Sequence, residues 1–460
     1  CISSAASDVY KRQQLYFKED YMSEESFKEK VFKLKEHGTN TRTEIMAGIT
    51  TFMTMSYILA VNPSILADAG MEPGAVFTST IIASIVAMLL VAFYANMPLG
   101  LSAGMGLNAF FAYTIVNKMG MSWQFALTAV FLEGIIFIIL SLTGAREALF
   151  NAIPINLKKA VSVGIGLFIA LIGLINASIV GVGDTSLELG NIASKEGFVF
   201  FFALIIMVVL TARNIKGALL WGILTATVLS LILGVSKIPE GNTIVSLPPS
   251  ISEVAFKLDF SNVFSFEMFS VLFSFLFVDI FDTLGTLTGV ATKANMLDEN
   301  GNLPNGSKAL LSDAVGTTLG SLLGTSTITT FVESTAGVAE GGRTGLTALS
   351  TAVCFGIAAF FFPLFSMIPT QATSAALVVV GLFMLSTVIE IDFTDITEAF
   401  PAFMTILMMP VTYSIAEGIS FGMISYAAIK LLTGRGKEVS PLVYGIAIVF
   451  LLRYIVPGLS

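Results

Sequence analysis

Residues 324 to 345 read GTSTITTFVESTAGVAEGGRTG, and this stretch decides how the rest of the chain can fold. It lies among long apolar segments, yet it is too polar and too rich in glycine to form one uninterrupted helix facing lipid. Thr325 to Val332 is a run of hydroxyl and β-branched residues, which favours an extended backbone. From Glu333 the composition favours a short helix, which Gly341 and Gly342 end. Because non-helical backbone at membrane depth must be surrounded by protein or line a water-filled cavity, we predict a substrate site here.

A second interrupted stretch lies in the first half of the chain, where residues 98 to 111 read PLGLSAGMGLNAFF. Glycine or proline interruptions at corresponding places in two halves point to the binding site of a transporter built from repeats. We take Ile45 and Met268 as the starts of the halves. Asn108 then lies 63 residues into the first half, and Glu333 lies 65 residues into the second. The count predicts that these two polar residues occupy matching positions.

The composition is typical of a polytopic membrane protein with helical spans. Of the 460 residues, 55% are hydrophobic and only 12% are charged, against roughly 25% charged residues in soluble domains. The formal net charge of −8 gives no reason to expect a nucleic-acid partner. With two cysteines, Cys1 and Cys354, and one histidine, His37, we expect no metal cluster, no disulfide framework and no cofactor.

The apolar segments predict an all-α membrane protein with about 14 spans in two inverted sets of seven. The expected spans lie near residues 45–62, 74–96, 98–117, 122–144, 159–181, 197–213 and 216–236, then 268–290, 307–324, 325–341, 344–368, 371–389, 400–415 and 418–432. Two of them, 98–117 and 325–341, are broken. This divides the chain into a tail (1–43), a first repeat (44–236), a linker (237–267) and a second repeat with a C-terminal segment (268–460). The last apolar segment, 441–457, is either a further span or a surface helix.

Lysines and arginines cluster on one side of this topology. They gather before the first span, between the fourth and fifth, between the sixth and seventh, and after the fourteenth, each time after an even number of crossings. The positive-inside rule then predicts a multi-pass protein of the cell membrane with its N-terminus in the cytoplasm and its linker 237–267 on the outer side.

Charged side chains inside the spans each cost roughly 2.5 to 3.5 kcal/mol at the bilayer centre, so each needs a partner or a purpose. We predict that Glu333, at the start of a half-helix, is a substrate-binding carboxylate that accepts paired N–H bonds from a planar heterocycle. The alternative is that Glu333 only caps the half-helix. Asp282 is predicted to bind the substrate or to carry the coupling proton, the alternative being a structural hydrogen bond to the broken backbone.

Asp279 stands three residues before Asp282 on roughly the same helical face. One of the two can therefore line a cavity while the other contacts a neighbouring helix. Asp279, Asp282 and Glu333 are our candidates for proton coupling. The remaining acids within the spans, Asp313, Glu133 and Glu417, are better explained by contacts between helices.

Uncharged residues beside the two breaks complete the candidate site. Asn108 can supply a donor and an acceptor together. Thr54 and Thr286 are candidate hydroxyl contacts, although threonines in helices often bond to their own backbone. Phe331 could stack on a flat ring, with simple packing as the alternative.

One motif invites an enzymatic interpretation. Residues 181 to 184, GVGD, have the form found in intramembrane aspartyl proteases, but they lie at the outer end of a span and no Tyr-Asp pair in a neighbouring span completes a dyad. The chain also has no Gly-x-x-x-x-Gly-Lys-Ser/Thr loop that would cradle the phosphates of ATP. We therefore expect a secondary transporter rather than an enzyme.

Four separated blocks occur in order: TFMTMSYI (51–58) with VNP (61–63), GMGLNAFF (104–111), DIFDTLGT (279–286), and the stretch 327–345. Together they resemble the AzgA-like purine permeases, the hypoxanthine, guanine and adenine branch of the nucleobase/cation symporter and nucleobase–ascorbate superfamily. The likeness runs from about residue 44 to residue 457. It implies a core domain (spans 1 to 4 and 8 to 11) and a gate domain (5 to 7 and 12 to 14), with a short strand and a half-helix in spans 3 and 10.

The resemblance also implies the function and its residues. It implies proton-coupled import of purine bases, with substrate contacts from Asp282, Glu333 and Asn108. Backbone groups of Val332 and Leu107, expected at exposed strand ends, would add to them. Thr286 stands where the wider superfamily often has a histidine.

Carriers of other substrates on the same fold remain as alternatives. An anion carrier would need a basic residue at a half-helix start, and the sequence has none there. A uracil or xanthine carrier would differ only in single contacts to the base. A homodimer through the gate helices is implied by the resemblance alone.

Overall fold

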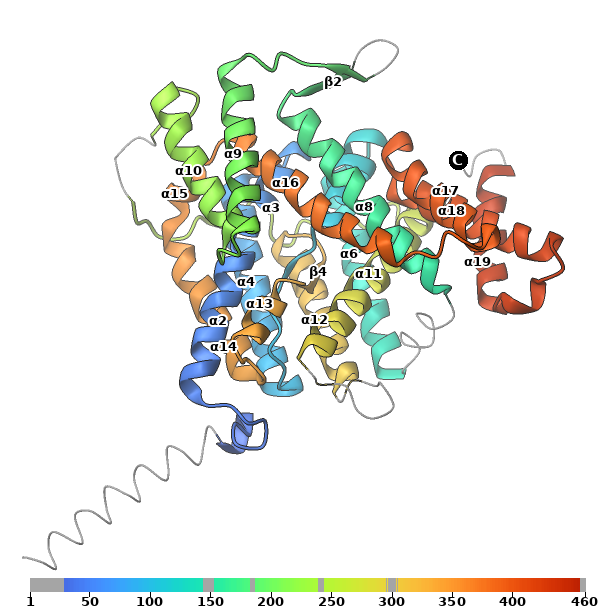
Figure 1. The fold of residues 1–460 in the computed structure, drawn as a ribbon, viewed down its shortest axis with the longest axis horizontal. Coiled ribbons are helices and arrows are strands. Elements are labelled where there is room, and N and C mark those ends of the chain that lie inside the picture. Colours follow the sequence, from blue (N-terminus) through green and yellow to red (C-terminus); the bar gives the residue numbers. More distant parts are fainter. Residues whose placement is uncertain are drawn as a thin grey trace, which may run out of the picture.

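The computed structural model describes residues 29–143, 153–182, 187–238, 244–294, 296, 303 and 305–455. The first half contains α2 (Thr41–Met55), α3 (Ile58–Asp68), α4 (Pro73–Leu90), η1 (Val91–Ala95), β1 (Leu101–Ala103), α5 (Met105–Ala109), η2 (Phe110–Lys118), α6 (Trp123–Thr143), α8 (Ile155–Asn176), α9 (Lys195–Ala212) and α10 (Ala218–Leu233). A hairpin of β2 (Val180–Val182) and β3 (Leu187–Leu189) follows α8. Figure 1 shows it at one end of the helix bundle.

The second half repeats this order. It contains α11 (Phe266–Lys293), α12 (Gly306–Leu323), β4 (Ile328–Thr330), α13 (Ser334–Ala339), α14 (Gly345–Ala358), η3 (Ala359–Phe361), α15 (Phe362–Ser366), α16 (Thr370–Leu385), η4 (Ser386–Glu390), α17 (Ile396–Thr412), α18 (Ile415–Leu432), η5 (Gly436–Glu438) and α19 (Pro441–Ile455). In the described part of the chain, nine helices are long and apolar enough to cross a membrane, and three shorter apolar helices accompany them. With α12 and the two broken spans, each half contributes seven spans before α19 begins.

The expected spans are confirmed, with one notable shift. The fifth was expected over residues 159–181, but α8 begins at Ile155 and ends at Asn176. Gly181 and Val182 of the motif that suggested a protease belong to β2, an antiparallel strand outside the helix, while Asp184 lies outside the described residues. The predicted span extended beyond the end of α8 because residues 177–182 are almost all apolar, and such a run is compatible with a short strand as well as with a helix.

The spans divide into a core and a gate. In the core, α12 packs against α6 and α4, and α14 packs against α2 and α4; in the gate, α8 packs against α16 and α17, and α9 against α10. Glycines allow helices of the gate to approach each other closely. A Cβ on Gly166 would lie 2.7 Å from the carbonyl oxygen of Gly381, and one on Gly164 would lie 2.5 Å from Sδ of Met409. Helices at this distance pack backbone to backbone.

The position of α19 answers the question that the sequence left open. At its start, the Tyr444 hydroxyl donates to the carbonyl oxygen of Gly436 at 3.1 Å. Near its end, the Tyr454 hydroxyl bonds to Glu417, in the first turn of α18. Because its start lies near the end of α18 and its end near the start of α18, α19 runs antiparallel to α18 over about 22 Å. It is a further helix of the bundle rather than a surface helix.

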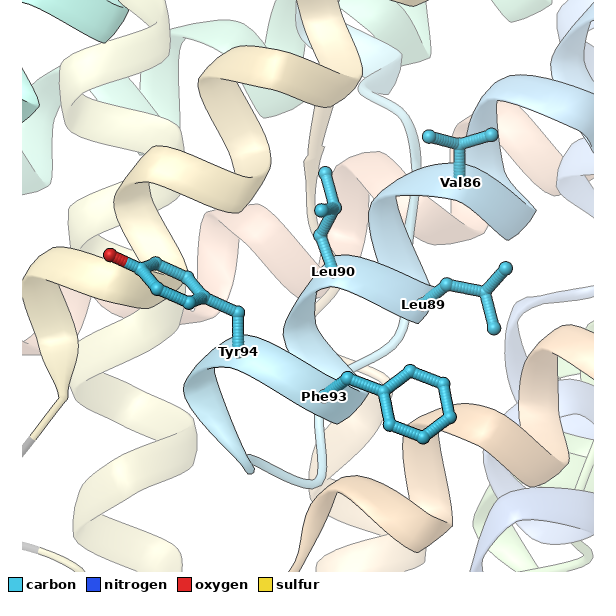
Figure 2. Close-up of a pocket in the computed structure, with 5 residues that line it drawn as sticks. All are labelled: Val86, Leu89, Leu90, Phe93 and Tyr94. Atoms are coloured by element: carbon cyan, nitrogen blue, oxygen red, sulfur yellow. The ribbon is translucent and has the colours of Figure 1, made fainter. Parts of the chain in front are cut away.

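The side of α4 and η1 that points away from the bundle is apolar. Val86, Leu89, Leu90, Phe93 and Tyr94 line a shallow groove of about 340 Å³ there, and Figure 2 shows all five side chains projecting from this one helical segment. Phe93 is 54% exposed and Tyr94 48%. Aromatic residues exposed on a spanning helix are typical of contact with lipid, so we assign this groove to the membrane-facing surface.

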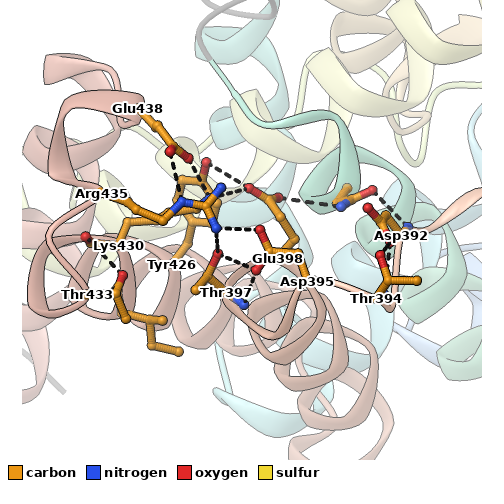
Figure 3. A network of polar contacts seen from close by, with 12 residues as sticks. Asp392, Thr394, Asp395, Thr397, Glu398, Tyr426, Lys430, Thr433, Arg435 and Glu438 are labelled. Atoms are coloured by element: carbon orange, nitrogen blue, oxygen red, sulfur yellow. Dashed lines mark hydrogen bonds and ion pairs between the residues drawn. The ribbon is translucent and has the colours of Figure 1, made fainter.

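A charged network holds the start of α17 to the end of α18 (Figure 3). The Lys430 side chain is fully buried, and its ammonium group lies 2.8 Å from both Glu398 and Glu438. Arg435 bridges Asp395 at 2.5 Å and Glu438 at 2.8 Å. Hydrogen bonds from Arg435 hold the pKa of the Asp395 carboxyl well below its usual range, and those from Arg435 and Lys430 lower the pKa of Glu438 to about 2. Since both pKa values are depressed, the stabilisation is present at neutral pH and is lost as the pH falls towards these values.

We predict that Lys430→Met destabilises the gate, because it leaves two carboxylates facing each other without their shared buried cation. The expected loss is about 1 to 3 kcal/mol, since both carboxylates keep some contact with solvent. Thermal unfolding of the purified protein in detergent, followed by fluorescence size-exclusion chromatography, measures it. Lys437→Met, at an exposed neighbouring lysine, is the matched control; equal midpoints for the two variants would contradict the assignment.

Candidate functional site

The two interrupted stretches meet in the middle of the bundle, where β1 and β4 form an antiparallel pair. Figure 1 shows β4 and α13 surrounded by the helices of the core. The pairs are Leu101 with Thr330, Ser102 with Thr329, and Ala103 with Ile328. The ladder continues at both ends, where the Gly104 amide donates to Thr327 at 3.0 Å and the Phe331 amide donates to Gly100 at 2.9 Å. Each stretch thus satisfies the backbone of the other at membrane depth, and all six strand residues are buried.

A half-helix leaves each strand. Gly104 is the N-cap of α5, and Glu333 is the N-cap of α13. The helix predicted to begin at Glu333 and to end before Gly341 is confirmed, because α13 spans Ser334–Ala339 and Gly341 has a φ of +102°. Strands of equivalent repeats that pair antiparallel agree with the inverted topology read from the odd number of spans.

The predicted match between Asn108 and Glu333 is approximate: the two residues differ by two positions when counted from the strand ends and by four when counted from the N-caps of the half-helices. The N-cap that corresponds to Glu333 is Gly104, and Asn108 lies four residues further, within α5 (Met105–Ala109). Counting from the start of each half failed because the segments before the two strands differ in length. The two polar residues therefore approach the strand pair from different positions on their half-helices.

Glu333 faces the first span rather than its own helix. The Tyr57 hydroxyl donates to Oε1 of Glu333 at 2.6 Å, and the carboxylate makes no capping hydrogen bond to α13 in the described structure. Thr54 bonds to its own helix, at 3.1 Å to Thr50 O and 2.9 Å to Thr51 O, and reaches the carbonyl oxygen of Glu333 at 3.4 Å. The geometry thus does not favour the alternative that Glu333 only caps the half-helix. For Thr54, the alternative that it bonds to its own backbone accounts for two of its three contacts.

Asp282, on α11, lies beside the strand pair. Its carboxylate lies near the Thr329 hydroxyl on β4 and close to the carboxylate of Glu333. Asp282 and Glu333 both keep part of their surface accessible. A Cβ on Gly104 would lie 2.8 Å from Oγ1 of Thr329 and 3.4 Å from Oδ2 of Asp282. Only glycine therefore lets β1 approach this acid so closely.

Asp279 faces the other way. It is fully buried, and its Oδ1 accepts a hydrogen bond from Thr283 at 2.7 Å. Thr283 in turn lies 3.5 Å from Oδ2 of Asp313 on α12. The two aspartates of α11 are thus divided: Asp282 lies beside the strand pair, while Asp279 is buried against Thr283, which lies near Asp313 of α12.

Asn108 is fully buried in α5, and the Ser326 hydroxyl donates to its Oδ1. Its Nδ2 group has no hydrogen-bond partner among the described residues. An unpaired buried amide carries a desolvation cost of about 1 to 3 kcal/mol. That cost is relieved if a bound molecule accepts a hydrogen bond from this group.

The remaining predicted residues occupy three different environments. Thr286 is half-buried one turn after Asp282 on α11. Phe331 is buried directly after β4, whereas Val332 is 52% exposed. Leu107 corrects an expectation: it lies inside α5, in the first helical turn, because the strand already ends at Ala103. It offers a half-helix backbone rather than a strand end.

Two of the acids that the sequence assigned to contacts between helices, Glu133 and Glu417, bond to residues of other segments. Oε2 of Glu133, on α6, accepts from the Thr327 hydroxyl at 2.8 Å, directly before β4. Glu417 lies in the first turn of α18 and bonds to Tyr454. Both contacts join segments distant in the sequence.

Two contributors to the site were missed at the sequence level. Tyr57 was part of a quoted block but was not selected, since a tyrosine in an apolar span is usually packing. Its position at the break between α2 and α3 was the available signal. Thr329 could not be found, because strand register decides which of several neighbouring threonines faces Asp282.

The arrangement defines a class of protein. Two half-helices that start at a central strand pair, inside a bundle of two inverted seven-span repeats, form the binding site of a membrane transporter. The chain belongs to the Permease family, whose sequence profile matches residues 42–421. It is therefore a transporter and not an enzyme.

Characterised relatives cover almost the whole chain. Guanine/hypoxanthine permease PbuO of Bacillus subtilis is 46% identical over 429 residues, which are 92% of this chain and 99% of the relative. Adenine permease AdeP of Escherichia coli is 41% identical over 428 residues, covering 93% and 96%. Among solved structures, the transmembrane domain of the cyanobacterial bicarbonate transporter BicA aligns with a TM-score of 0.61 at 17% identity, covering 82% of this chain and 97% of that one. At that identity the structural match shows the fold alone.

We predict that Gly104→Val weakens ligand binding, because the added side chain would press on Thr329 and Asp282. Overpacking at such a site typically costs about 1 to 3 kcal/mol, and a loss of that size weakens binding by roughly tenfold to a hundredfold. Hypoxanthine binding to the purified variant by isothermal titration calorimetry measures this effect. Gly445→Val, where a Cβ meets nothing within 4 Å, is the control; unchanged affinity for Gly104→Val would contradict the geometry.

Proposed function

We propose that this protein imports purine nucleobases across the cell membrane together with protons. The observation that carries the proposal is the pair of partly accessible acids, Glu333 and Asp282, which lie close to each other beside the β1–β4 strand pair. Purine bases are planar and present several N–H donors, which suit two carboxylates. Relatives that cover nearly the whole chain are named as adenine and guanine/hypoxanthine permeases, which supports the same substrate class.

Each residue has a distinct role in this proposal. Glu333 accepts N–H bonds from one edge of the purine, and Asp282 binds a second edge or takes the coupling proton. Asn108 reads the carbonyl or a ring nitrogen; its unpaired Nδ2 group supports a donor role. Thr286, Phe331, Thr54 and the backbones of Val332 and Leu107 would shape the rest of the site, and Asp279 would share the proton with Asp282.

The topology follows from the distribution of basic residues. We infer that α2 begins at the cytoplasmic face, so that Asp68, Tyr113 and Asn176 lie at the outer face and Lys216 with Glu340 at the inner face. A homodimer through the gate would suit an exposed apolar stripe on α17, made of Phe400, Phe403, Leu407 and Val411.

Transport would require the core to move against the gate, and polar contacts join the two among the described residues, including those from Thr114 and Lys118 to the end of α17. At the outer face, Nδ2 of Asn176 in the gate donates to the Tyr113 hydroxyl at 2.6 Å and to Asp68 at 3.1 Å. Tyr113 itself donates to Asp68 at 2.7 Å. At the inner face, Lys216 of the gate pairs with Glu340 at the end of α13. Contacts of this kind must break on one face for the site to open there.

We predict that purines accumulate in cells that lack their own purine transport when this protein is expressed. Uptake of radiolabelled hypoxanthine, guanine, adenine and uracil is measured with and without a protonophore. Purine uptake should exceed uracil uptake, and the protonophore should abolish accumulation. Glu333→Gln should lower uptake at least tenfold, because one strong acceptor is lost. Absence of purine uptake by the unchanged protein would refute the substrate class.

We predict that Asn176→Ala opens the outer face more often, because it removes the gate's two bonds to Tyr113 and Asp68. Val332→Cys, in a background where Cys1 and Cys354 are serine, reports the change through labelling by a membrane-impermeant maleimide from outside. Labelling should become severalfold faster with Asn176→Ala. Asn214→Ala, between α9 and α10, is the control, and equal labelling rates in both would count against this outer contact.

A further inference from the structure

Tyr57 occupies an unusual place in the first span. It lies between the end of α2 at Met55 and the start of α3 at Ile58, and it is 1% exposed. Its hydroxyl hydrogen is directed at Oε1 of Glu333 at 2.6 Å. A hydrogen bond this short to a carboxylate is typical of charge assistance. The break in the span therefore brings a buried phenol onto the acid that the proposed function places at the substrate.

A phenol has one hydrogen, and its direction depends on its partner. When Glu333 is ionised, the hydroxyl must donate to the carboxylate, so it presents only lone pairs to a neighbouring molecule. When Glu333 carries a proton, the carboxyl group can donate instead. The Tyr57 hydrogen is then released to point at a bound molecule. The same side chain thus offers an acceptor in one state and a donor in the other.

The other groups around Glu333 do not compete for this role. From the first span, Thr54 reaches only its carbonyl oxygen. From α11, Asp282 is a second carboxyl group close to Glu333, and no hydrogen bond between these two described residues is seen. Among the described residues no basic side chain forms an ion pair with Glu333. Tyr57 is therefore the group whose hydrogen bond responds directly to the charge on Glu333.

We propose that Tyr57 is a positioning residue that links protonation of Glu333 to purine binding. A proton from the aqueous side binds Glu333, and the other oxygen of the carboxyl group still accepts an N–H bond from the purine. The Tyr57 hydroxyl then turns from the acid to the base, so the purine gains a hydrogen-bond donor only in the protonated state. The proposal rests on the proposed function and adds to it the means by which the two ligands favour each other's binding.

The test is the pH dependence of hypoxanthine binding to the full-length protein in detergent, by isothermal titration calorimetry. In the unchanged protein, affinity should fall as the pH rises through a midpoint. Tyr57→Phe should weaken binding roughly tenfold on the acid side, because the donor to the base is lost. It should also move the midpoint about one pH unit higher, since the ionised acid loses its hydrogen bond.

Two further variants separate this role from simple packing. In a Glu333→Gln background, Tyr57→Phe should produce no shift of any midpoint, because residue 333 no longer titrates. Replacing Tyr57 by 3,5-difluorotyrosine, a stronger donor of the same shape, should move the midpoint lower, and this variant serves if Tyr57→Phe does not fold. Tyr426→Phe, which removes a bond to Glu398 in the gate, should leave the binding curve unchanged.

The outcomes distinguish the two proposals. If the unchanged protein binds none of hypoxanthine, guanine and adenine, the proposed function fails. If it binds them but its affinity is independent of pH, or if both Tyr57 variants keep the original midpoint, the proposed function stands and the role of Tyr57 is refuted. Uniform weakening at every pH would likewise reduce Tyr57 to a packing residue.

Discussion

The antiparallel pairing of β1 with β4 is the constraint on which the rest of the structure depends. Extended backbone at membrane depth has no water to satisfy its N–H and C=O groups, and lipid offers none. The only solution open to two such segments is to pair with each other, and Leu101–Ala103 with Ile328–Thr330 do so. The pairing fixes both half-helices, and it requires every surrounding helix of the core to close around it.

Much of this could be predicted from the sequence, because polar and glycine-rich residues inside apolar segments are a strong signal. The two breaks, the helix start after Glu333 and the approximate spans all follow from composition and periodicity. The register did not follow. Counting matched Asn108 with Glu333, whereas the N-caps of the two half-helices match Gly104 with Glu333. The number of residues from the start of a half depends on the lengths of loops and helix ends, which differ between the two repeats. Equal counts therefore do not identify equivalent positions in the structure.

Individual contacts were beyond sequence reasoning for a different reason. Asp279 and Asp282 are three residues apart on roughly the same helical face, so the sequence pattern does not distinguish their directions. Only the surrounding structure shows that Asp282 lies near Thr329, whereas Asp279 accepts a hydrogen bond from Thr283. Tyr57 could be noticed only once a break in the first span was known. In both cases tertiary contacts, which no local pattern contains, select one residue from several of the same chemistry.

The origin of the site residues bears on how such a transporter could work. Tyr57, Asn108, Asp282, Thr329 and Glu333 all lie on core elements, namely the first span, α5, α11, β4 and the start of α13. The gate approaches them through apolar side chains: a Cβ on Gly106 would lie 2.7 Å from Cγ2 of Ile165 on α8. Polar contacts hold the site together within the core, and weakly directional packing separates it from the gate. A core that slides along the gate would therefore keep its hydrogen bonds while exchanging one apolar contact for another, so a bound molecule could change sides without the site being dismantled.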